Sequence, residues 1–583
     1  MTQPTIPWRS KAGLDDPRVQ RCYDRGNAFF DKDVPMLSRP RSNPRSNPNQ
    51  NWKDLTAKLS TELWSSVEKP AWGGATANFL PRQRFRRIVT PERVRAIVAG
   101  LAPFNGRDLE AFVHVAFHGG LFDGVYRRPS VKLLAALICV NAVNNYLDLV
   151  SKGVSDVCLP PVFDQNHIIN PLKCQNPKCN TGHTFLGDIS IRDRRDFFAW
   201  AYYLNAPYFK KPEPPKPPKP GTPMPGLHYH YIFNEGDILP IISSSVQDPG
   251  SATSRSRQAA NANSSRSQGA QDGGFSTVTR VELHPEHFDF GAQNGEKYQF
   301  FALKKLNTSD QTMFSNELAS LLAFIANDNE HLVKLLASFE IRSSVTNRTQ
   351  YYLLFPWADG TLWDFWKLND VLDRGANLSK WMSDQCYRLA SALQAFHNER
   401  KNQLRFLNIE NDNKELYSRH GNIKAENILW FKAQSRLVLN DFGLARLHTK
   451  ISRSAQDLNT MGRTETYRAP EFDMPNSKIS RTSDIFSLGC AYLDFVTWYI
   501  EGFYSVDVQF VDARSEPDPH DPAFKLDTFF KIEAKSGKPT PVIKPQVKGW
   551  IQRLRDHRNC TQYILDFLEL IEEHMLNPNP KQR

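Results

Sequence analysis

The sequence feature that most constrains the fold is a polar octapeptide, HGNIKAEN, at residues 420–427. It is followed by a short apolar segment, RLVLN at residues 436–440, and then by the tripeptide DFG at residues 441–443. Each short motif is weak evidence when taken alone, because such matches also arise by chance. The order of several motifs along the chain is much stronger evidence.

Further motifs lie on both sides of the octapeptide. Residues 301–304 (FALK) have the character of a strand that ends in Lys304. Glu317 lies on a predicted amphipathic helix, because apolar residues recur around it at helical spacing, namely Phe314, Leu318, Leu321, Leu322 and Ile325. The remaining motifs, in chain order, are YYLLF at 351–355, PWADG at 356–360, APE at 469–471 and SDIFSLG at 483–489.

In this order and at this spacing the motifs resemble those of eukaryotic protein kinases. The chain is most similar to the fungal serine/threonine-kinase-like proteins with a helical N-terminal extension, and the resemblance covers residues 232–583. It implies an α+β, bilobal protein kinase fold, preceded by a small all-α N-terminal domain. The small β lobe would have five strands and one long helix, the large lobe would be mostly helical, and ATP would bind between the two lobes.

The resemblance also implies a role for each motif residue. Lys304 would grip the ATP phosphates and Glu317 would orient Lys304. Asn427 and Asp441 would bind Mg²⁺. The other nucleotide contacts would come from the glycine-rich loop, the strands and the hinge that follows them, at Gly273, Gly274, Val278, Ala302, Phe355 and Trp357.

Two large-lobe residues would have structural roles in such a fold. Asp484 would brace the catalytic loop, and Arg583 would form an ion pair with Glu471 of the APE motif. This pairing places the end of the sequence just short of the last large-lobe helix, whether that end is native or a truncation.

The catalytic loop departs from the family pattern at one position. The family has a carboxylate where this chain has Asn422, and an amide cannot serve as a base. A positioned general base contributes roughly 10²–10⁴ in rate. Phosphoryl transfer depends mainly on positioning and electrostatics, however, and the Asn422 carbonyl can still accept a hydrogen bond from a hydroxyl. Slow transfer remains open, and so does a loop that no longer performs chemistry.

The glycine-rich loop is also altered. Counting back from Val278, the loop is QDGGFSTV at residues 271–278, which keeps the middle glycine and lacks the outer two. A looser cover over ATP is expected, because close backbone approach to phosphate favours glycine. The strand expected before the loop is missing as an apolar segment, since residues 264–269 (SSRSQG) contain no alternating hydrophobic residues. Residues 277–283 predict the next strand.

Two functions follow from these motifs. The first is an ATP-binding serine/threonine phosphotransferase of weak or conditional activity, in which Asn422 positions the acceptor hydroxyl and Lys424 the phosphoryl group. Lys424 and Thr464 are both typical of the serine/threonine class. The alternative is a pseudokinase that acts as a scaffold or interaction module. A third, weaker possibility is a regulator whose working part is the helical extension.

Composition limits the partners and the location of the protein. The net charge is +11, but the basic clusters at residues 82–87 and 192–195 are short, so we expect a solvated surface and no nucleic-acid partner. No apolar segment reaches the roughly 18–20 residues of a membrane span, so no membrane partner is expected. Eight scattered cysteines suit a reducing compartment, which favours the cytoplasm or the nucleus.

The chain divides into four predicted parts. Residues 1–51 are a predicted flexible tail, residues 52–208 a helical domain, residues 209–231 a proline-rich linker and residues 232–583 the kinase-like domain. Residues 244–272 are a predicted disordered insert within the last part. In the helical domain, one helix is predicted to begin at Thr90-Pro91, and others cover 107–121, 129–151 and 193–205.

A zinc site in the helical domain is a further possibility. Its candidate ligands are Cys174, Cys179 and His183, with Cys158 and His167 upstream. The usual spacing between zinc-binding cysteines is tighter, so a polar loop with idle thiols is the favoured alternative.

One prediction concerns phosphorylation. Gly421 stands where many members of the family have an arginine that pairs with a phosphate on the activation segment. Phosphomimetic changes Ser452→Glu, Ser454→Glu and Thr460→Glu should therefore leave phosphotransfer activity unchanged in a radiolabelled-ATP assay. Strong activation by any of the three would contradict this expectation.

Overall fold

The structure is a computed structural model of the whole chain, and part of the chain is described. The described residues are 19–22, 52–72, 77–161, 172–174, 184–187, 189–211, 228–246, 276–291, 299–307, 310–311, 314–315, 317–318, 321, 329–343, 346–370, 374–406, 417–441, 446–448, 466–475, 477–518, 525–535 and 538–583.

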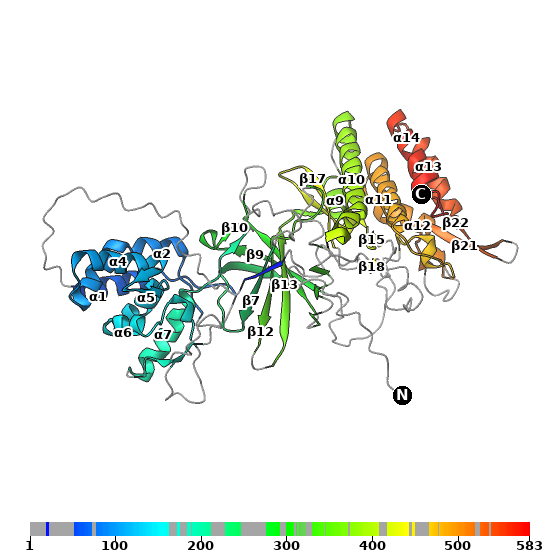
Figure 1. Cartoon of the computed structure of the whole chain (residues 1–583). Coiled ribbons are helices and arrows are strands. Elements are labelled where there is room, and N and C mark those ends of the chain that lie inside the picture. The colour runs from blue at the N-terminus through cyan, green and yellow to red at the C-terminus, as the bar shows by residue number, and fades with distance from the viewer. Residues whose placement is uncertain are drawn as a thin grey trace, which may run out of the picture.

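A seven-stranded sheet lies between an N-terminal helical region and a C-terminal helical lobe (Figure 1). The strands, in spatial order, are β1 (Val19–Cys22), β7 (His228–Asn234), β12 (Ala337–Arg342), β13 (Thr349–Pro356), β11 (Phe301–Leu306), β9 (Ser276–Leu283) and β8 (Ile241–Val246). The five strands from β12 to β8 pair antiparallel, and β7 and β1 extend the sheet with parallel pairing. The sheet therefore has two strands more than the five predicted.

Side chains alternate between the two faces of this sheet, as the strand geometry requires. Tyr352 and Leu354 belong to an aromatic cluster on one face, which also contains Phe209, Tyr229, Tyr231, Phe233, Phe301 and Phe339. Tyr351 and Leu353 point to the other face, where they join the core that includes Phe314 and the large lobe. Both faces are buried, so these strands show little alternation of polar and apolar residues in the sequence.

The prediction that the strand before the glycine-rich loop is missing was wrong. That strand is β8, which pairs antiparallel with β9 from Ile241↔Leu283 to Val246↔Thr279. It lies before the low-complexity segment, and residues 244–246 of the predicted insert belong to it. The glycine-rich segment with Gly273 and Gly274 falls outside the described residues. The sequence did not show this pairing because the two strands are far apart along the chain.

The large lobe is mostly helical. Its helices are α9 (Leu362–Leu368), α10 (Ala376–Phe406), α11 (Thr482–Glu501), α12 (Phe510–Arg514), α13 (Pro545–Arg555) and α14 (Gln562–Glu569). Its strands are β14 (Gly360–Thr361), β15 (Tyr417–Arg419), β16 (Ile428–Phe431), β17 (Arg436–Leu439), β18 (Arg446–His448), β19 (Glu516–Pro517), β20 (Lys525–Leu526), β21 (Phe530–Lys535) and β22 (Lys538–Ile543).

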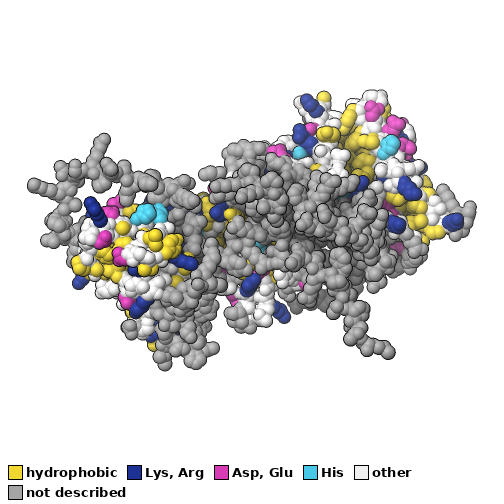
Figure 2. Space-filling view, viewed as in Figure 1, with side chains coloured by type: hydrophobic (Ala, Val, Ile, Leu, Met, Phe, Trp, Pro, Cys, Tyr) yellow, Lys and Arg dark blue, Asp and Glu magenta, His cyan; other side chains and the backbone are white. Residues whose placement is uncertain are grey.

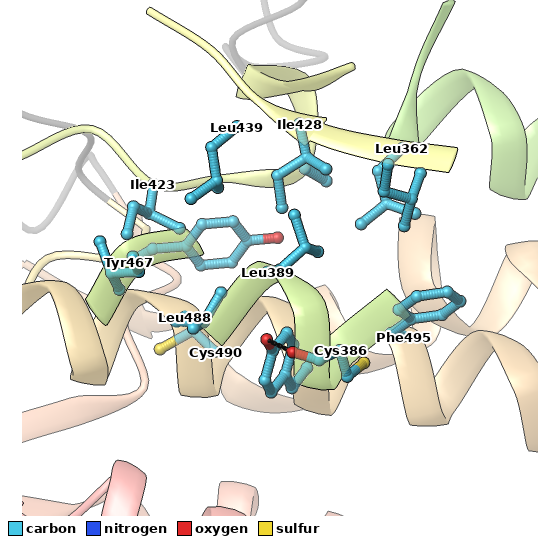
Figure 3. Packing of buried hydrophobic residues seen from close by; sticks show 14 of the residues in the cluster. Leu362, Cys386, Leu389, Ile423, Ile428, Leu439, Tyr467, Leu488, Cys490 and Phe495 are labelled. Atoms are coloured by element: carbon cyan, nitrogen blue, oxygen red, sulfur yellow. Dashed lines mark hydrogen bonds between the residues drawn. The ribbon is translucent and has the colours of Figure 1, made fainter. Parts of the chain in front are cut away.

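Helix α11 forms the centre of this lobe, because nearly all of its side chains are buried. A helix that is hydrophobic all round must be covered on every side. In Figure 3, Ile423, Ile428 and Leu439 pack above Leu389, and Leu488 lies below it. The octapeptide and the strands that follow it are thus anchored in the main core of the lobe.

The N-terminal region is mainly helical. Its helices are α1 (Trp52–Trp64), α2 (Arg82–Ile88), α3 (Pro91–Leu101), α4 (Gly106–His118), α5 (Val131–Cys139), α6 (Tyr146–Ser151) and α7 (Ile191–Tyr203). Two short hairpins, β2–β3 (Gly120–Phe122 and Val125–Arg127) and β4–β5 (Leu172–Lys173 and Thr184–Phe185), mean that it is not entirely α. None of the described helices of the chain is long and apolar enough to cross a membrane.

Helix boundaries in this region follow local sequence signals. The start predicted at Thr90 is confirmed, since the Thr90 side chain accepts a hydrogen bond from the Arg93 N–H and Pro91 occupies the first turn. The single helix predicted over 129–151 was wrong, because it is divided into α5 and α6. Asn141 lies between them with φ +54°, a conformation that asparagine tolerates better than most residues.

The helical region contacts the sheet through several defined interactions. Glu286 accepts hydrogen bonds from the backbone N–H groups of Gln83 and Arg84, at the positive end of α2. The Ala71 N–H donates to the Ile241 carbonyl at the start of β8. Strand β6 (Phe209–Lys210) also pairs with β10 (Phe288–Asp289). The N-terminal region is therefore attached directly to the strand that leads toward the glycine-rich segment.

The predicted basic clusters take part in internal contacts. Arg84 pairs with Glu68 at 2.5 Å, and the Arg82 guanidinium lies 4.3 Å from the centre of the Tyr208 ring. In the face shown in Figure 2, the described Lys and Arg side chains are interspersed with Asp and Glu. This arrangement is that of a solvated surface of mixed charge.

A buried polar group supports helix α5. Asp156 accepts a hydrogen bond from the Leu133 N–H at the start of α5, and Lys132 donates to Asn205 at 2.8 Å. Burial raises the pKa of Asp156, and the Lys132 charge and the helix N–H groups oppose that effect. Burial lowers the pKa of Lys132 to about 7, and the Asp156 carboxylate acts against that shift. Asp156 therefore satisfies helix donors and favours the charged form of the buried lysine.

Replacing this carboxylate should destabilise the protein. We expect Asp156→Ala to lower the free energy of unfolding of the N-terminal region by about 3–5 kcal/mol, because it leaves Lys132 buried without its counter-charge. The matched control is Asp148→Ala, which removes an exposed pair with Lys152 and should cost about 0.3–0.5 kcal/mol. Chemical denaturation measures both, and equal small losses would contradict the assignment.

Candidate functional site

Three charged residues from distant parts of the chain meet on one face of the sheet, beside its inner strand β11. Lys304 Nζ on β11 lies 2.9 Å from Glu317 Oε1, and Glu317 belongs to a helical segment. The same Nζ lies 3.2 Å from Asp441 Oδ1, just beyond β17. The Lys304 and Glu317 side chains are only 14% and 13% exposed. Lys304, Glu317 and Asp441 form an ion triad.

The electrostatics of the ion triad keep the lysine charged. Burial alone lowers the pKa of Lys304, but the carboxylates of Glu317 and Asp441 outweigh burial and raise the pKa above its ordinary value. A charged and positioned ammonium is suited to hold an anion such as a phosphate.

The octapeptide forms a loop closed by its own hydrogen bonds. Asn427 Nδ2 donates to the backbone carbonyl of Asn422 at 2.8 Å, and the backbone N–H of Asn427 donates to the backbone carbonyl of Lys424 at 2.9 Å. The Asn440 N–H donates to the Asn427 carbonyl at 3.0 Å, which places the loop beside Asp441. Since Asn427 Nδ2 is used within the loop, Oδ1 is its remaining ligand atom for a cation.

Asn422 makes a contact that the usual carboxylate could not make. Its Nδ2 donates a hydrogen bond to Asp441 Oδ2 at 3.0 Å. Asp441 therefore accepts a hydrogen bond from Lys304 at Oδ1 and one from Asn422 at Oδ2. Its backbone has φ +63°, which is uncommon for a residue with a side chain. Asn422 thus acts as a donor that fixes Asp441.

Asp484 on α11 braces the start of the loop, as predicted. It accepts hydrogen bonds from the His420 N–H at 2.8 Å and the Gly421 N–H at 2.9 Å. His397 Nε2 lies 2.8 Å from the same carboxylate. Burial acts to raise the pKa of Asp484, but its hydrogen bond with His397 and the nearby positive charges lower it below the ordinary value. The brace therefore remains a charged acceptor.

Arg419 is a residue that sequence analysis missed. Gly421 has φ +78°, and a Cβ at that position would lie 3.3 Å from Arg419 Nη2. The guanidinium of Arg419 therefore occupies the space beside Gly421, although position 421 itself has no arginine. The place of Arg419 directly before the octapeptide was the available signal.

The predicted nucleotide-contact residues on the strands share one face of the sheet. Lys304 is paired with Val278 across β9, and Ala302 is paired with Phe355 across β13. Cross-strand partners lie on the same face, and so do residues two apart. The backbone N–H of Trp357 donates to the Phe300 carbonyl at 3.2 Å, which fixes the start of the hinge segment.

Arg280 is a second residue that sequence analysis missed. It is paired with Ala302, so it lies on the same face as the ion triad lysine. Its guanidinium lies 3.8 Å from the Phe300 ring centre and 5.6 Å from that of Trp357. Arg280 lies two residues after Val278, so the period of two along a strand could have placed both on the same face.

The remaining predicted residues have different outcomes. Lys424 is half-buried within the loop. Phe442, Gly443, Thr464, His167, Cys179 and His183 lie outside the described residues. Cys158 and Cys174 are buried, and within the described ranges no group of three or more His, Cys, Asp or Glu side chains could hold a metal ion.

Residues 290–501 match the protein-family model described as Protein kinase domain. The matched range contains the ion triad, the octapeptide and the APE motif, and it ends with α11. The chain therefore contains a protein kinase domain of the eukaryotic protein kinase superfamily. Strands β7, β8 and β9 precede the matched range.

The predicted pair of Arg583 and Glu471 is confirmed. Arg583 Nη2 lies 2.5 Å from Glu471 Oε2, and Arg583 Nη1 donates to the Thr482 carbonyl at 3.1 Å. Both charged side chains are almost fully buried. The pair joins the APE motif to the start of α11.

Removing this arginine should destabilise the large lobe. Arg583→Ala leaves the Glu471 carboxylate buried without a counter-ion, and we expect a loss of about 3–5 kcal/mol in the free energy of unfolding. The control Arg388→Ala removes an exposed pair with Asp384 and should cost about 0.3–0.5 kcal/mol. Similar midpoints for the two variants in urea denaturation would refute this role.

Proposed function

We propose that this protein binds ATP between the small-lobe sheet and the octapeptide loop. We further propose that it is a protein serine/threonine phosphotransferase of weak or conditional activity. The observation that carries the proposal is the ion triad, in which Lys304 is held charged between Glu317 and Asp441. Such a lysine is the group that pairs with nucleotide phosphates in kinases.

The surrounding residues suit the rest of a nucleotide. Val278, Ala302 and Phe355 supply an apolar surface beside Lys304, which suits a flat base. The hinge backbone begins beside that surface, where the Trp357 N–H is bonded to the Phe300 carbonyl. The geometry therefore separates a charged end for phosphate from an apolar end for adenine.

The residues present also fit a magnesium ion. Asp441 offers a carboxylate and Asn427 offers Oδ1, and hard cations prefer oxygen ligands. When bound, Mg²⁺ neutralises charge on the phosphates. Asp441 would have to exchange its hydrogen bonds from Lys304 and Asn422 to coordinate the ion.

Asn422 sets the expected rate. Its Nδ2 is directed at Asp441, which makes Oδ1 the atom that can accept a hydrogen bond from an acceptor hydroxyl. An amide orients that hydroxyl but does not take its proton. Transfer should therefore be slower by roughly 10²–10⁴ than with a carboxylate at this position. The acceptor would be a serine or threonine of a protein, and a cytoplasmic or nuclear site remains the expectation.

One observation favours the alternative, a pseudokinase that binds ATP without transferring phosphate. The Asn422 hydrogen bond occupies a carboxylate oxygen of Asp441 that metal coordination would use. In this case the chain would act as a scaffold or interaction module, and ATP would stabilise its conformation.

The test compares the wild type with Asn422→Asp and Lys304→Met. We expect the wild type and Asn422→Asp to bind ATP with Mg²⁺ in a fluorescent-nucleotide titration, and Lys304→Met to lose binding. Phosphotransfer to a generic protein substrate should rise by roughly 10²–10⁴ in Asn422→Asp, because a base is restored.

Each other outcome has a clear meaning. Binding by both proteins without phosphotransfer in the wild type, but with it in the aspartate variant, would favour the pseudokinase. Failure of the wild type and Asn422→Asp to bind ATP would refute the nucleotide proposal. Asn422→Asp also places two carboxylates where the amide now lies 3.0 Å from Asp441, so its ATP binding should depend more strongly on Mg²⁺.

A further inference from the structure

Strand β7 brings two buried histidines beneath the helical segment that carries Glu317. His228 and His230 alternate with aromatic residues along the strand, so both point to the same face of the sheet. Strand β7 precedes the matched kinase range and pairs in parallel with β12. These histidines therefore come from outside the matched domain and lie in its interior.

The histidines are held by a polar network on β12. His228 Nε2 and His230 Nδ1 lie 2.8 Å and 2.9 Å from Ser338 Oγ. His230 Nε2 lies 3.3 Å from Glu340 Oε2, and Arg342 Nε donates to Glu340 Oε1 at 2.6 Å. The orientation of the His230 ring is thus fixed at both nitrogens.

The His230 ring contacts the helical segment directly. Its centre lies 5.5 Å from that of Phe314, and Phe314 stacks on Tyr351 at 4.3 Å. Phe314 is fully buried, and Glu317 follows it at a spacing of about one helical turn. The Phe314 ring and Glu317 are therefore carried on adjacent turns of the same helical segment.

We propose that His230 is a positioning residue, which sets the Glu317–Lys304 ion pair by supporting Phe314. Strand β7 comes after the N-terminal helical region in the chain, and its outer edge pairs with β1. The N-terminal part of the chain thereby contributes to the geometry of the nucleotide site. The effect on ATP affinity rests on the proposed function, whereas the effect on the helical segment does not.

Hydrogen exchange on the full-length protein tests the support of the helical segment. In His230→Ala, the backbone amides of residues 314–321 should exchange faster than in the wild type, by about tenfold or more, without nucleotide. Phe314→Leu removes the ring contact and leaves the polar network in place, so it should give the same local effect. The control is Tyr231→Phe, which alters the opposite face of the same strand and removes the hydroxyl that accepts from the Lys210 N–H. Unchanged exchange at residues 314–321 in both test variants would overturn the proposal.

ATP affinity provides the second measurement. We expect His230→Ala to weaken ATP binding about tenfold, because Glu317 then holds Lys304 less firmly in the position that meets phosphate. In a Glu317→Gln background the same change should have almost no effect, since the positioned ion pair is already lost. An equal loss in both backgrounds would mean a general structural role and would overturn the proposal. If the wild type binds no ATP, the proposed function fails, and hydrogen exchange alone decides the role of His230.

Discussion

The ion pair between Lys304 and Glu317 is the interaction on which the rest of the site depends. It joins a strand of the sheet to a helical segment, and Asp441 connects the same lysine to the large lobe. Mostly buried charges are stable only when they are paired, so loss of one member leaves the others uncompensated. The site therefore forms only when β11, the helical segment with Glu317 and the chain after β17 lie together, and the packing of each element must place it there.

Asn422 changes the balance of charge at this point. A carboxylate in its place would face Asp441, and the two would repel each other unless a cation lay between them. The amide removes that repulsion and adds a hydrogen bond, so the Asp441 carboxylate is stabilised at this position even without a metal ion. The same change removes the base, which links greater stability of the site to slower chemistry.

Sequence motifs predicted the parts of the site that depend on local order. The Lys304–Glu317 pair, the Asp484 brace and the pair of Arg583 with Glu471 follow from the motif series, whereas the contact of Lys304 with Asp441 was seen only in the structure. The sequence did not predict β7, because both of its faces are buried, so its alternating histidine and aromatic residues do not give the pattern of a half-exposed strand. It also did not predict the pairing of β8 with β9, because no local signal links two strands separated by a long low-complexity segment. Arg419 and Arg280 were missed because their roles depend on tertiary neighbours.

The strand order has a consequence for the shape of the small lobe. β7 and β8 follow each other in the chain, yet four strands separate them in the sheet. Across a flat sheet they would be roughly 24 Å apart, and residues 235–240 span at most roughly 25 Å when fully extended. The turn from Asn234 to Asp237 shortens that reach, so the sheet must curl until β7 and β8 approach each other. Tyr231 and Ile241 accordingly share one core, and the sheet is close to a partly closed barrel. In such a shape, the strand beneath Glu317 and the strand that leads toward the glycine-rich segment pack against one core.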